Sequence, residues 1–137
     1  MILRRIKVHP FGGLGDGELF LKEGLNVILG PNEAGKSTIF NAIQKCLLIS
    51  TNLTPSQLAK VFQPFIPIGG DTANVEIDFV HDDATYLLRK SWGATRKSEM
   101  QLPDESILTD EEGISSRLKA ILPSTEGTFR SVLMCYQ

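Results

Sequence analysis

The segment that most constrains the fold of this 137-residue chain is Gly30-Pro31-Asn32-Glu33-Ala34-Gly35-Lys36-Ser37-Thr38. It matches G-x-x-x-x-G-K-[ST], the pattern of loops that hold phosphate groups. Because Gly30 and Gly35 lack a Cβ, the backbone can turn its N–H groups inward around an anion. Lys36 offers a positive charge to the β- and γ-phosphates, and the Ser37 hydroxyl is suited to ligate Mg²⁺. The segment therefore predicts a nucleotide phosphate site.

The flanks of this segment predict a strand, a glycine loop and a helix, in that order. Residues 25–29 are a short apolar run with β-branched members, which indicates a buried strand. Residues 38–49 carry apolar side chains near a 3.6-residue period, which indicates a helix. The N-terminus of that helix would add a partial positive charge and free N–H groups beside the phosphates.

Composition is that of an ordinary globular domain, with 42% hydrophobic and 22% charged residues. The net charge of −2 gives no general attraction to nucleic acid or to an anionic membrane. No apolar run approaches the roughly 20 residues that span a bilayer, and residues 1–7 lack the features of a signal peptide. We therefore expect a cytoplasmic location and no membrane partner. Cys46 and Cys135 are expected to be buried free thiols.

The rest of the chain predicts a mixed α/β fold. Residues 2–9 and 18–22 are expected to pair as an antiparallel hairpin, and alternation predicts an antiparallel meander over 72–81, 84–92 and 96–102. Thr54, Pro55 and Gln57 carry a capping signature for a helix that runs to about Phe62, followed by an irregular stretch over 63–70. A second capping box, Thr109-Asp110-Glu111-Glu112, predicts a helix up to Pro123. A helical turn at 125–129 and an apolar strand at 131–136 complete the expectation.

Only half of a nucleotide site is visible in the sequence. A phosphate-loop ATPase also needs an acidic residue at the end of a second apolar strand, to hold Mg²⁺. No such run follows position 38, and Asp78 lies in an alternating strand whose polar face is interpreted as solvated. We therefore expect residues 1–137 to be a single incomplete domain, the first lobe of something longer.

Four basic residues in the meander region have two interpretations. They are Arg89, Lys90, Arg96 and Lys97. A solvated face of the sheet is the first interpretation. The second is a contact with the DNA backbone, which requires Lys and Arg clustered on one face.

Three segments together resemble the N-terminal lobe of an ABC-class ATPase head of the SMC type. They are Ile6-x-x-x-x-Phe11-Gly12-x-Leu14, Gly24-Leu25-Asn26-Val27-Ile28 and the run from Gly30 to Thr38. This group includes SbcC-, RecF-, RecN- and YhaN-like proteins, and the residues look most like the YhaN-like branch. Val132-Leu133-Met134-Cys135-Tyr136-Gln137 resembles the strand and glutamine of the Q-loop. The resemblance implies an α/β P-loop NTPase core, with the antiparallel β-meander packed beside the phosphate loop.

The resemblance also assigns roles to residues. Backbone amides would wrap the phosphates of ATP along Asn32, Glu33, Ala34, Gly35, Lys36, Ser37 and Thr38. Lys36 and Gln137 would serve catalysis, Ser37 and Gln137 would approach Mg²⁺, and Thr38 would reach the α-phosphate. SbcC-like relatives often carry an arginine just after the phenylalanine that matches Phe11. In this chain that position is Gly12, so no arginine contact is expected from this loop.

Partners follow from the same resemblance. The second lobe of the head would complete the domain, and two heads would form a homodimer around ATP. DNA, in repair or chromosome maintenance, and a nuclease subunit are implied only through the family. The parent protein would hydrolyse ATP. This chain alone lacks the acidic Mg²⁺-binding strand and the signature motif, so we expect it to be inactive.

Three other functions stay open on the sequence alone. A transporter-type ABC ATPase can share the loop, but Gln137 follows Lys36 by 101 positions, which is typical of the SMC-like group. A G protein would need an N-K-x-D motif, which is absent from the sequence, and a small-molecule kinase would need a basic lid, for which Arg89, Lys90, Arg96 and Lys97 are a poor substitute. A nucleotide-binding module without hydrolysis is the third alternative.

Overall fold

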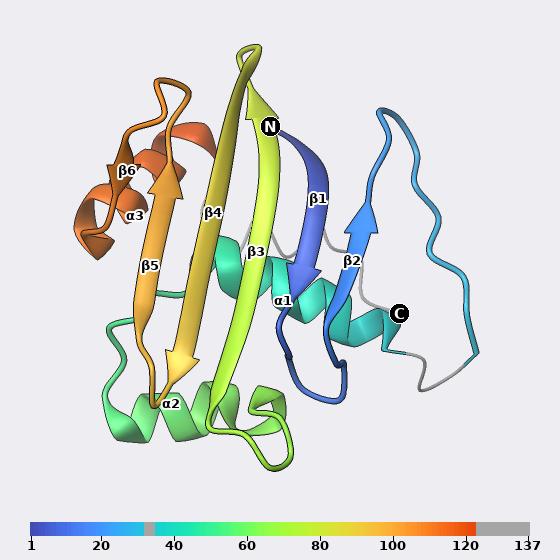
Figure 1. Ribbon diagram of the computed structural model, residues 1–137, viewed down its shortest axis with the longest axis vertical. Coiled ribbons are helices and arrows are strands. Elements are labelled where there is room, and N and C mark those ends of the chain that lie inside the picture. The colour runs from blue at the N-terminus through green and yellow to red at the C-terminus, as the bar shows by residue number, and fades with distance from the viewer. Residues whose placement is uncertain (32–34, 123–137) are drawn as a thin grey trace.

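The computed structural model describes residues 1–31 and 35–122, which form one antiparallel sheet with helices against one face (Figure 1). Six strands run in the order β2-β1-β3-β4-β5-β6. The strands are β1 (Ile2–Val8), β2 (Gly17–Phe20), β3 (Thr72–His81), β4 (Ala84–Gly93), β5 (Lys97–Gln101) and β6 (Ile107–Leu108). The helices are α1 (Lys36–Leu48), α2 (Pro55–Phe62), the 3₁₀ turn η1 (Gln63–Phe65) and α3 (Glu111–Ile121).

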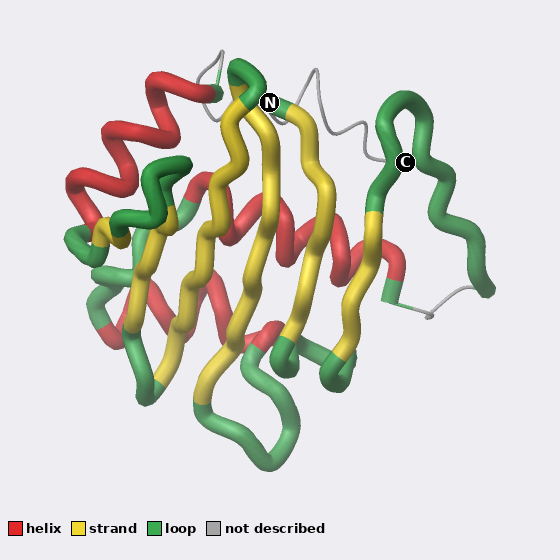
Figure 2. The backbone as a smooth tube through the Cα atoms, turned by 45° about the horizontal axis from the view of Figure 1, so that its top comes forward, coloured by secondary structure: helices red, strands yellow, loops and turns green. Residues whose placement is uncertain are grey.

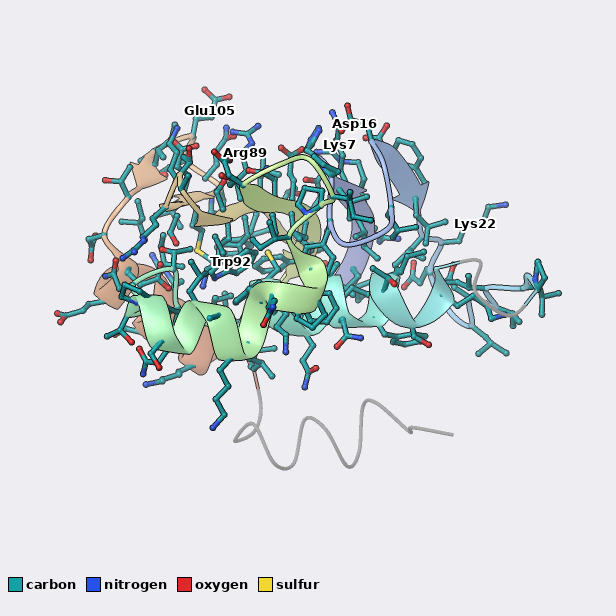
Figure 3. The ribbon with its side chains drawn as sticks, turned by 90° about the horizontal axis from the view of Figure 1, so that it is seen from below. Lys7, Asp16, Lys22, Arg89, Trp92 and Glu105 are labelled. Atoms are coloured by element: carbon teal, nitrogen blue, oxygen red, sulfur yellow. The ribbon has the colours of Figure 1, made fainter. Side chains whose placement is uncertain are left out.

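The core lies between the sheet and the helices. Figure 3, seen from below, shows the strands on one side and the helices on the other, with Trp92 directed toward α2. On β3 the alternating residues Val75, Ile77 and Phe79 are buried, as the two-residue period predicted. Figure 2 shows α1 passing behind the central strands. The apolar side of the central strands β3, β4 and β5 is thus covered by helices, and their polar side stays open.

The open face is held by charged pairs rather than by apolar packing. Arg5 on β1 donates to Asp78 at 2.7 Å, to Glu18 at 2.6 Å and also to Glu76. Arg89 on β4 donates to Glu76 at 2.7 Å. These contacts follow from register, because Arg5 pairs with Asp78 and Arg89 pairs with Glu76 across neighbouring strands. Asp78 therefore belongs to a structural pair on the open face.

Two predicted elements match the structure closely. Strands β1 and β2 pair as an antiparallel hairpin, and β3 to β5 form the predicted meander. Asp82 and Asp83 both have positive φ, which is the geometry of a tight two-residue hairpin turn. Helix α2 begins with the predicted capping box, in which Thr54 and Gln57 bond each other's backbone. Pairing of β1 with β3 places the N-terminal strand inside the sheet.

The prediction of a buried strand at residues 25–29 is wrong for this structure. Leu25 is 93% exposed and Leu29 is 87% exposed, and within the described residues no strand pairs with this segment. Asn26 gives a local reason, since its side chain accepts from Lys22 N at 2.9 Å and donates to Lys22 O at 2.7 Å. Such side-chain bonds compete with a strand ladder. A buried parallel strand also needs covered faces and neighbouring strands.

The second predicted capping box is not formed, because Gly113 at the third helical position has no side chain to complete it. Asp110, not Thr109, caps α3 by accepting from Gly113 N at 2.6 Å. Glu111 can then turn into the core. Strand β6 has no counterpart among the predicted elements, because two residues give no readable period. The predictions for 125–129 and 131–136, and the free thiol of Cys135, fall outside the described residues.

Candidate phosphate-binding site

The start of α1 has the backbone that an anion site needs. Gly35, at the N-cap, has φ 85° and ψ 10°, a left-handed conformation that favours glycine. Its carbonyl accepts the first helical hydrogen bond, from Ile39 N at 3.0 Å. No side chain of the described residues caps the helix, and its first turn, which begins at Lys36, carries no acid. The helix N-terminus therefore keeps its partial positive charge.

Lys36 bends back over the loop that precedes it. Its ammonium donates to the carbonyl oxygen of Pro31 at 2.9 Å and also to that of Gly30. An ammonium has three donors, and its four-carbon stem can redirect them. Lys36 thus ties the first glycine of the motif to the start of α1. To contact phosphates, Lys36 would exchange these carbonyl bonds for phosphate oxygens.

The two hydroxyl residues of the motif lie in the first turn of α1. Ser37 and Thr38 follow Lys36 directly in this helix. Asn41 donates to the Ser37 carbonyl at 2.9 Å, which supports this turn from within the helix. Asn32, Glu33 and Ala34 fall outside the described residues, and so does Gln137. The structure thus brings together Gly35, Lys36, Ser37 and Thr38.

The donor set at this end of α1 fits a phosphate chain with Mg²⁺ better than a metal held by protein alone. Within the described residues, no group of three His, Cys, Asp or Glu side chains is placed to hold a metal ion. Mg²⁺ commonly takes few protein ligands and keeps phosphate oxygens and waters. The Ser37 hydroxyl is a ligand of that kind, and Lys36 with the helix N-terminus suits the phosphates.

A buried polar cluster lies at the other end of α1, and the sequence pattern did not predict it. The solvated interpretation of Lys90 is wrong, because its side chain is 1% exposed and bonds Glu111 Oε1 at 3.0 Å. Lys90 also donates to Ile49 O, the C-cap of α1, at 2.9 Å. Thr51 donates to Glu111 at 2.9 Å, and Ser98 bonds the same carboxylate. The cluster joins α1, β4, β5 and α3.

The charge balance of this cluster shifts the pKa of Glu111. Burial alone would raise that pKa, but the hydrogen bonds from Ser98 and Lys90, with the Lys90 charge, lower it below its usual value. The signal that could have found the cluster is strand parity. Arg89 and Lys90 are adjacent in β4, so their side chains point to opposite faces of the sheet.

The other three basic residues do not form one cationic face with Lys90. Arg89 pairs with Glu76, and Lys97 pairs with Glu99 at 2.8 Å. Arg96 donates to Leu53 O at 3.0 Å. Each charge therefore has a neighbour in the fold. This arrangement gives no specific support to the DNA-backbone interpretation of these residues.

Cys46 confirms the expectation of a buried free thiol. It is fully buried, and burial raises its pKa to about 12. No helix in the described part of the chain is long and apolar enough to cross a membrane.

Comparison with known proteins shows the family of this chain. The family model described as "AAA domain" matches residues 5–136. A DNA double-strand break repair Rad50 ATPase of Thermoplasma acidophilum is 33% identical over 119 residues, which cover 87% of this chain and 12% of that protein. Structural maintenance of chromosomes protein 5 of Schizosaccharomyces pombe is 35% identical over 108 residues, or 77% of this chain and 10% of that protein.

A second Rad50 ATPase, from Pyrococcus abyssi, is 29% identical over 128 residues, which cover 90% of this chain and 14% of that protein. The chain thus spans only a small part of the length of these relatives. The family match, in contrast, extends over nearly the whole chain, including the second half of β1, all of α1 and the meander. This chain belongs to the AAA domain family and is similar over most of its length to Rad50 and SMC ATPases.

Proposed function

We propose that this chain is the ATP-binding half of an SMC-like ATPase head, which uses ATP-driven head dimerisation in DNA repair or chromosome maintenance. The observation that carries the proposal is the start of α1. There a left-handed glycine precedes a helix N-terminus that no described side chain caps, and the Lys36 ammonium bonds the carbonyl of Pro31 in the same loop. Similarity to Rad50 and SMC ATPases over most of the chain supports the same assignment.

In this proposal each residue of the motif has a physical task. The N–H groups of Gly35, Lys36, Ser37 and Thr38 would donate to phosphate oxygens, because the first N–H groups of a helix have no partner within it. Lys36 would balance the charge of the β- and γ-phosphates, and Ser37 would ligate Mg²⁺. Asn32, Glu33 and Ala34 would extend the ring of backbone donors. Gln137 would approach Mg²⁺ from the far end of the chain.

Hydrolysis is assigned to the complete head rather than to this chain. Mg²⁺ bound with ATP would neutralise phosphate charge, while the motif residues of this chain bind and orient the phosphates. An acid at the end of a second apolar strand does not occur after position 38. The second lobe of the head would supply it, and a second head would complete the site. DNA and a nuclease subunit are proposed partners of the whole protein.

The exposed segment at residues 25–29 is consistent with this division. Its apolar side chains, Leu25, Val27 and Leu29, lie in the open directly before the phosphate loop. Isolated apolar residues at a surface are normal, whereas several in one short segment indicate a surface that another part of the protein covers. We propose that the second lobe covers this segment.

Calorimetric titration of the chain with Mg-ATP tests the proposal. We expect measurable binding that Lys36→Ala weakens by at least about tenfold, since the lysine carries the only side-chain charge of the loop that favours phosphate. Lys60→Ala, on α2, is the matched control and should bind as the wild type does. Equal ATP affinity of the wild type and Lys36→Ala would contradict the assignment. Vigorous ATP hydrolysis by the chain alone would contradict the half-site.

A further inference from the structure

The turn between β1 and β2 lies against the phosphate-loop end of α1. Phe11 N donates to Leu14 O and Leu14 N donates to Phe11 O, both at 3.1 Å, so the two residues close a tight turn over Gly12 and Gly13. The Leu14 side chain occupies the place next to Gly35, where a Cβ on Gly35 would overlap its Cδ2. Leu14 therefore touches the loop one residue before Lys36.

A second contact lies on the other side of Lys36. A Cβ added to Gly12 would come within 3.3 Å of the Thr38 methyl group. Gly12 itself has φ 58°, a left-handed conformation. The turn therefore contacts Gly35 and the Thr38 side chain, which lie on either side of Lys36 in the sequence. The left-handed φ and this close approach both favour glycine at position 12.

The turn is anchored to the core by aromatic rings. Phe11 is fully buried and stacks on Phe65 with ring centroids 4.9 Å apart. Gly12 N donates to Phe65 O at 2.6 Å. Phe65 meets the edge of Phe62, which stacks on Trp92 at 4.6 Å. Leu14 is thus held by a row of rings that reaches β4, and aromatic pairs of this kind add stability beyond burial alone.

We propose that Leu14 is a positioning residue for the phosphate loop. Glycine has the widest conformational freedom of all residues, so the left-handed conformation of Gly35 needs a neighbour to hold it. Leu14 is that neighbour, and it acts through Gly35 without contacting phosphate. With Gly35 fixed, the N–H groups that follow it are aimed before any anion arrives, which reduces the ordering cost of binding. The effect on ATP affinity rests on the proposed function above.

The competing interpretation is that Leu14 is an ordinary apolar residue whose loss only loosens the fold. Leu19 on β2 offers a matched control, because it lines the same cavity of about 290 Å³ as Leu14 and pairs with Ile6 in the hairpin. Leu19→Ala removes the same atoms as Leu14→Ala. Only Leu14→Ala removes the neighbour of Gly35.

The first test needs no nucleotide. Hydrogen exchange of the Ile39 amide, which donates to Gly35 O, is measured in the full chain. We expect Leu14→Ala to speed this exchange by roughly tenfold relative to the wild type, while Leu19→Ala leaves it close to the wild-type rate. Equal acceleration in both variants, or none in Leu14→Ala, would overturn the proposal. If Leu14→Ala does not fold, Leu14→Val replaces it in the same comparison.

A double-mutant cycle gives the sharper readout. Gly35→Ala destabilises the loop in two ways: alanine is strained at the left-handed φ, and its Cβ overlaps the Leu14 side chain. Adding Leu14→Ala to the same chain removes the overlap but leaves the strain. We therefore expect the double variant to show less Ile39 exchange than the two single effects together predict. Additive effects would overturn direct contact as the cause.

Affinity for Mg-ATP completes the experiment. Leu14→Ala should weaken binding by about tenfold, Leu14→Met should restore most of it, and Leu19→Ala should bind normally. A normal affinity for Leu14→Ala would overturn the positioning role. If the wild type does not bind ATP, the proposed function fails, and the exchange measurements still decide whether Leu14 holds Gly35.

Discussion

Removing the charge of Lys90 tests the energetic role of the buried cluster. The side chain of Lys90 is 1% exposed and that of Glu111 is 8% exposed, so both charges are largely withdrawn from water. Breaking a buried ion pair from one side costs about 3–5 kcal/mol, since the other charge is left uncompensated. In Lys90→Met, the Thr51 and Ser98 hydroxyls still bond Glu111. We therefore expect the free energy of unfolding to fall by about 3 kcal/mol, the lower end of that range.

Urea unfolding followed by fluorescence measures this loss directly. Trp92 is the only tryptophan of the chain and is fully buried, so its emission reports the core. With a slope of about 1.5 kcal/mol per molar urea, 3 kcal/mol moves the midpoint by about 2 M. The double variant Lys90→Met/Glu111→Leu removes both charges and should unfold close to the wild type, because an apolar pair can replace a buried ion pair at little cost.

The pH dependence of stability gives an independent test of the Lys90–Glu111 pair. In the wild type, the pKa of Glu111 lies below its usual value, so the cluster stabilises the fold above the unfolded-state pKa and loses this effect as pH falls through the folded-state pKa. In Lys90→Met, burial of Glu111 without the lysine would raise the pKa of Glu111. As the solution becomes acidic, Glu111 is protonated, the uncompensated charge disappears and the folded variant becomes more stable. The deficit relative to the wild type should shrink between pH 7 and pH 5. A deficit that is absent, or that grows over this range, would refute the reasoning.

Three further predictions use the same unfolding assay or a simple reagent. Thr54→Ala removes the cap of α2 and should lower the free energy of unfolding by about 1 kcal/mol. An unchanged urea midpoint would contradict a stabilising role of this cap. Phe62→Ala opens the fully buried ring stack on Trp92 and should cost about 3–5 kcal/mol, so a loss under about 1 kcal/mol would exclude that packing. Burial raises the pKa of Cys46 to about 12, so in a Cys135→Ser background its thiol should react at pH 8 only as the chain unfolds. Rapid modification of the native chain would be the contrary result.

Local signals in the sequence predicted much of the fold. The cap at Thr54 and Gln57 needs only neighbouring residues, and the structure contains it as predicted. Alternation over 72–81 is equally local, because each side chain reports its own face. The two residues between the predicted strands 72–81 and 84–92, Asp82 and Asp83, form the hairpin turn. The pairing of β1 with β3 could not be predicted from the sequence, because about 70 residues separate the two strands and no local period encodes their register.

Long-range contacts explain where prediction from the sequence fails. Lys90 and Glu111 meet only when β4 and α3 pack together, so a row of basic residues indicates a solvated face when the sequence is taken alone. The apolar run 25–29 predicted a strand, but a strand exists only with a partner. At the candidate site, the sequence predicted the glycine and the lysine of the motif. It could not show that Leu14 lies next to Gly35.

The most direct test of the central claim is a titration of backbone amide NMR signals. The ¹⁵N-labelled chain is titrated with Mg-ATP, inorganic triphosphate and adenosine in turn. We predict that the signals of residues 35–39 shift with ATP and with triphosphate, and stay in place with adenosine. Signals that stay fixed with Mg-ATP, or that move equally with adenosine, would contradict a phosphate site at the start of α1.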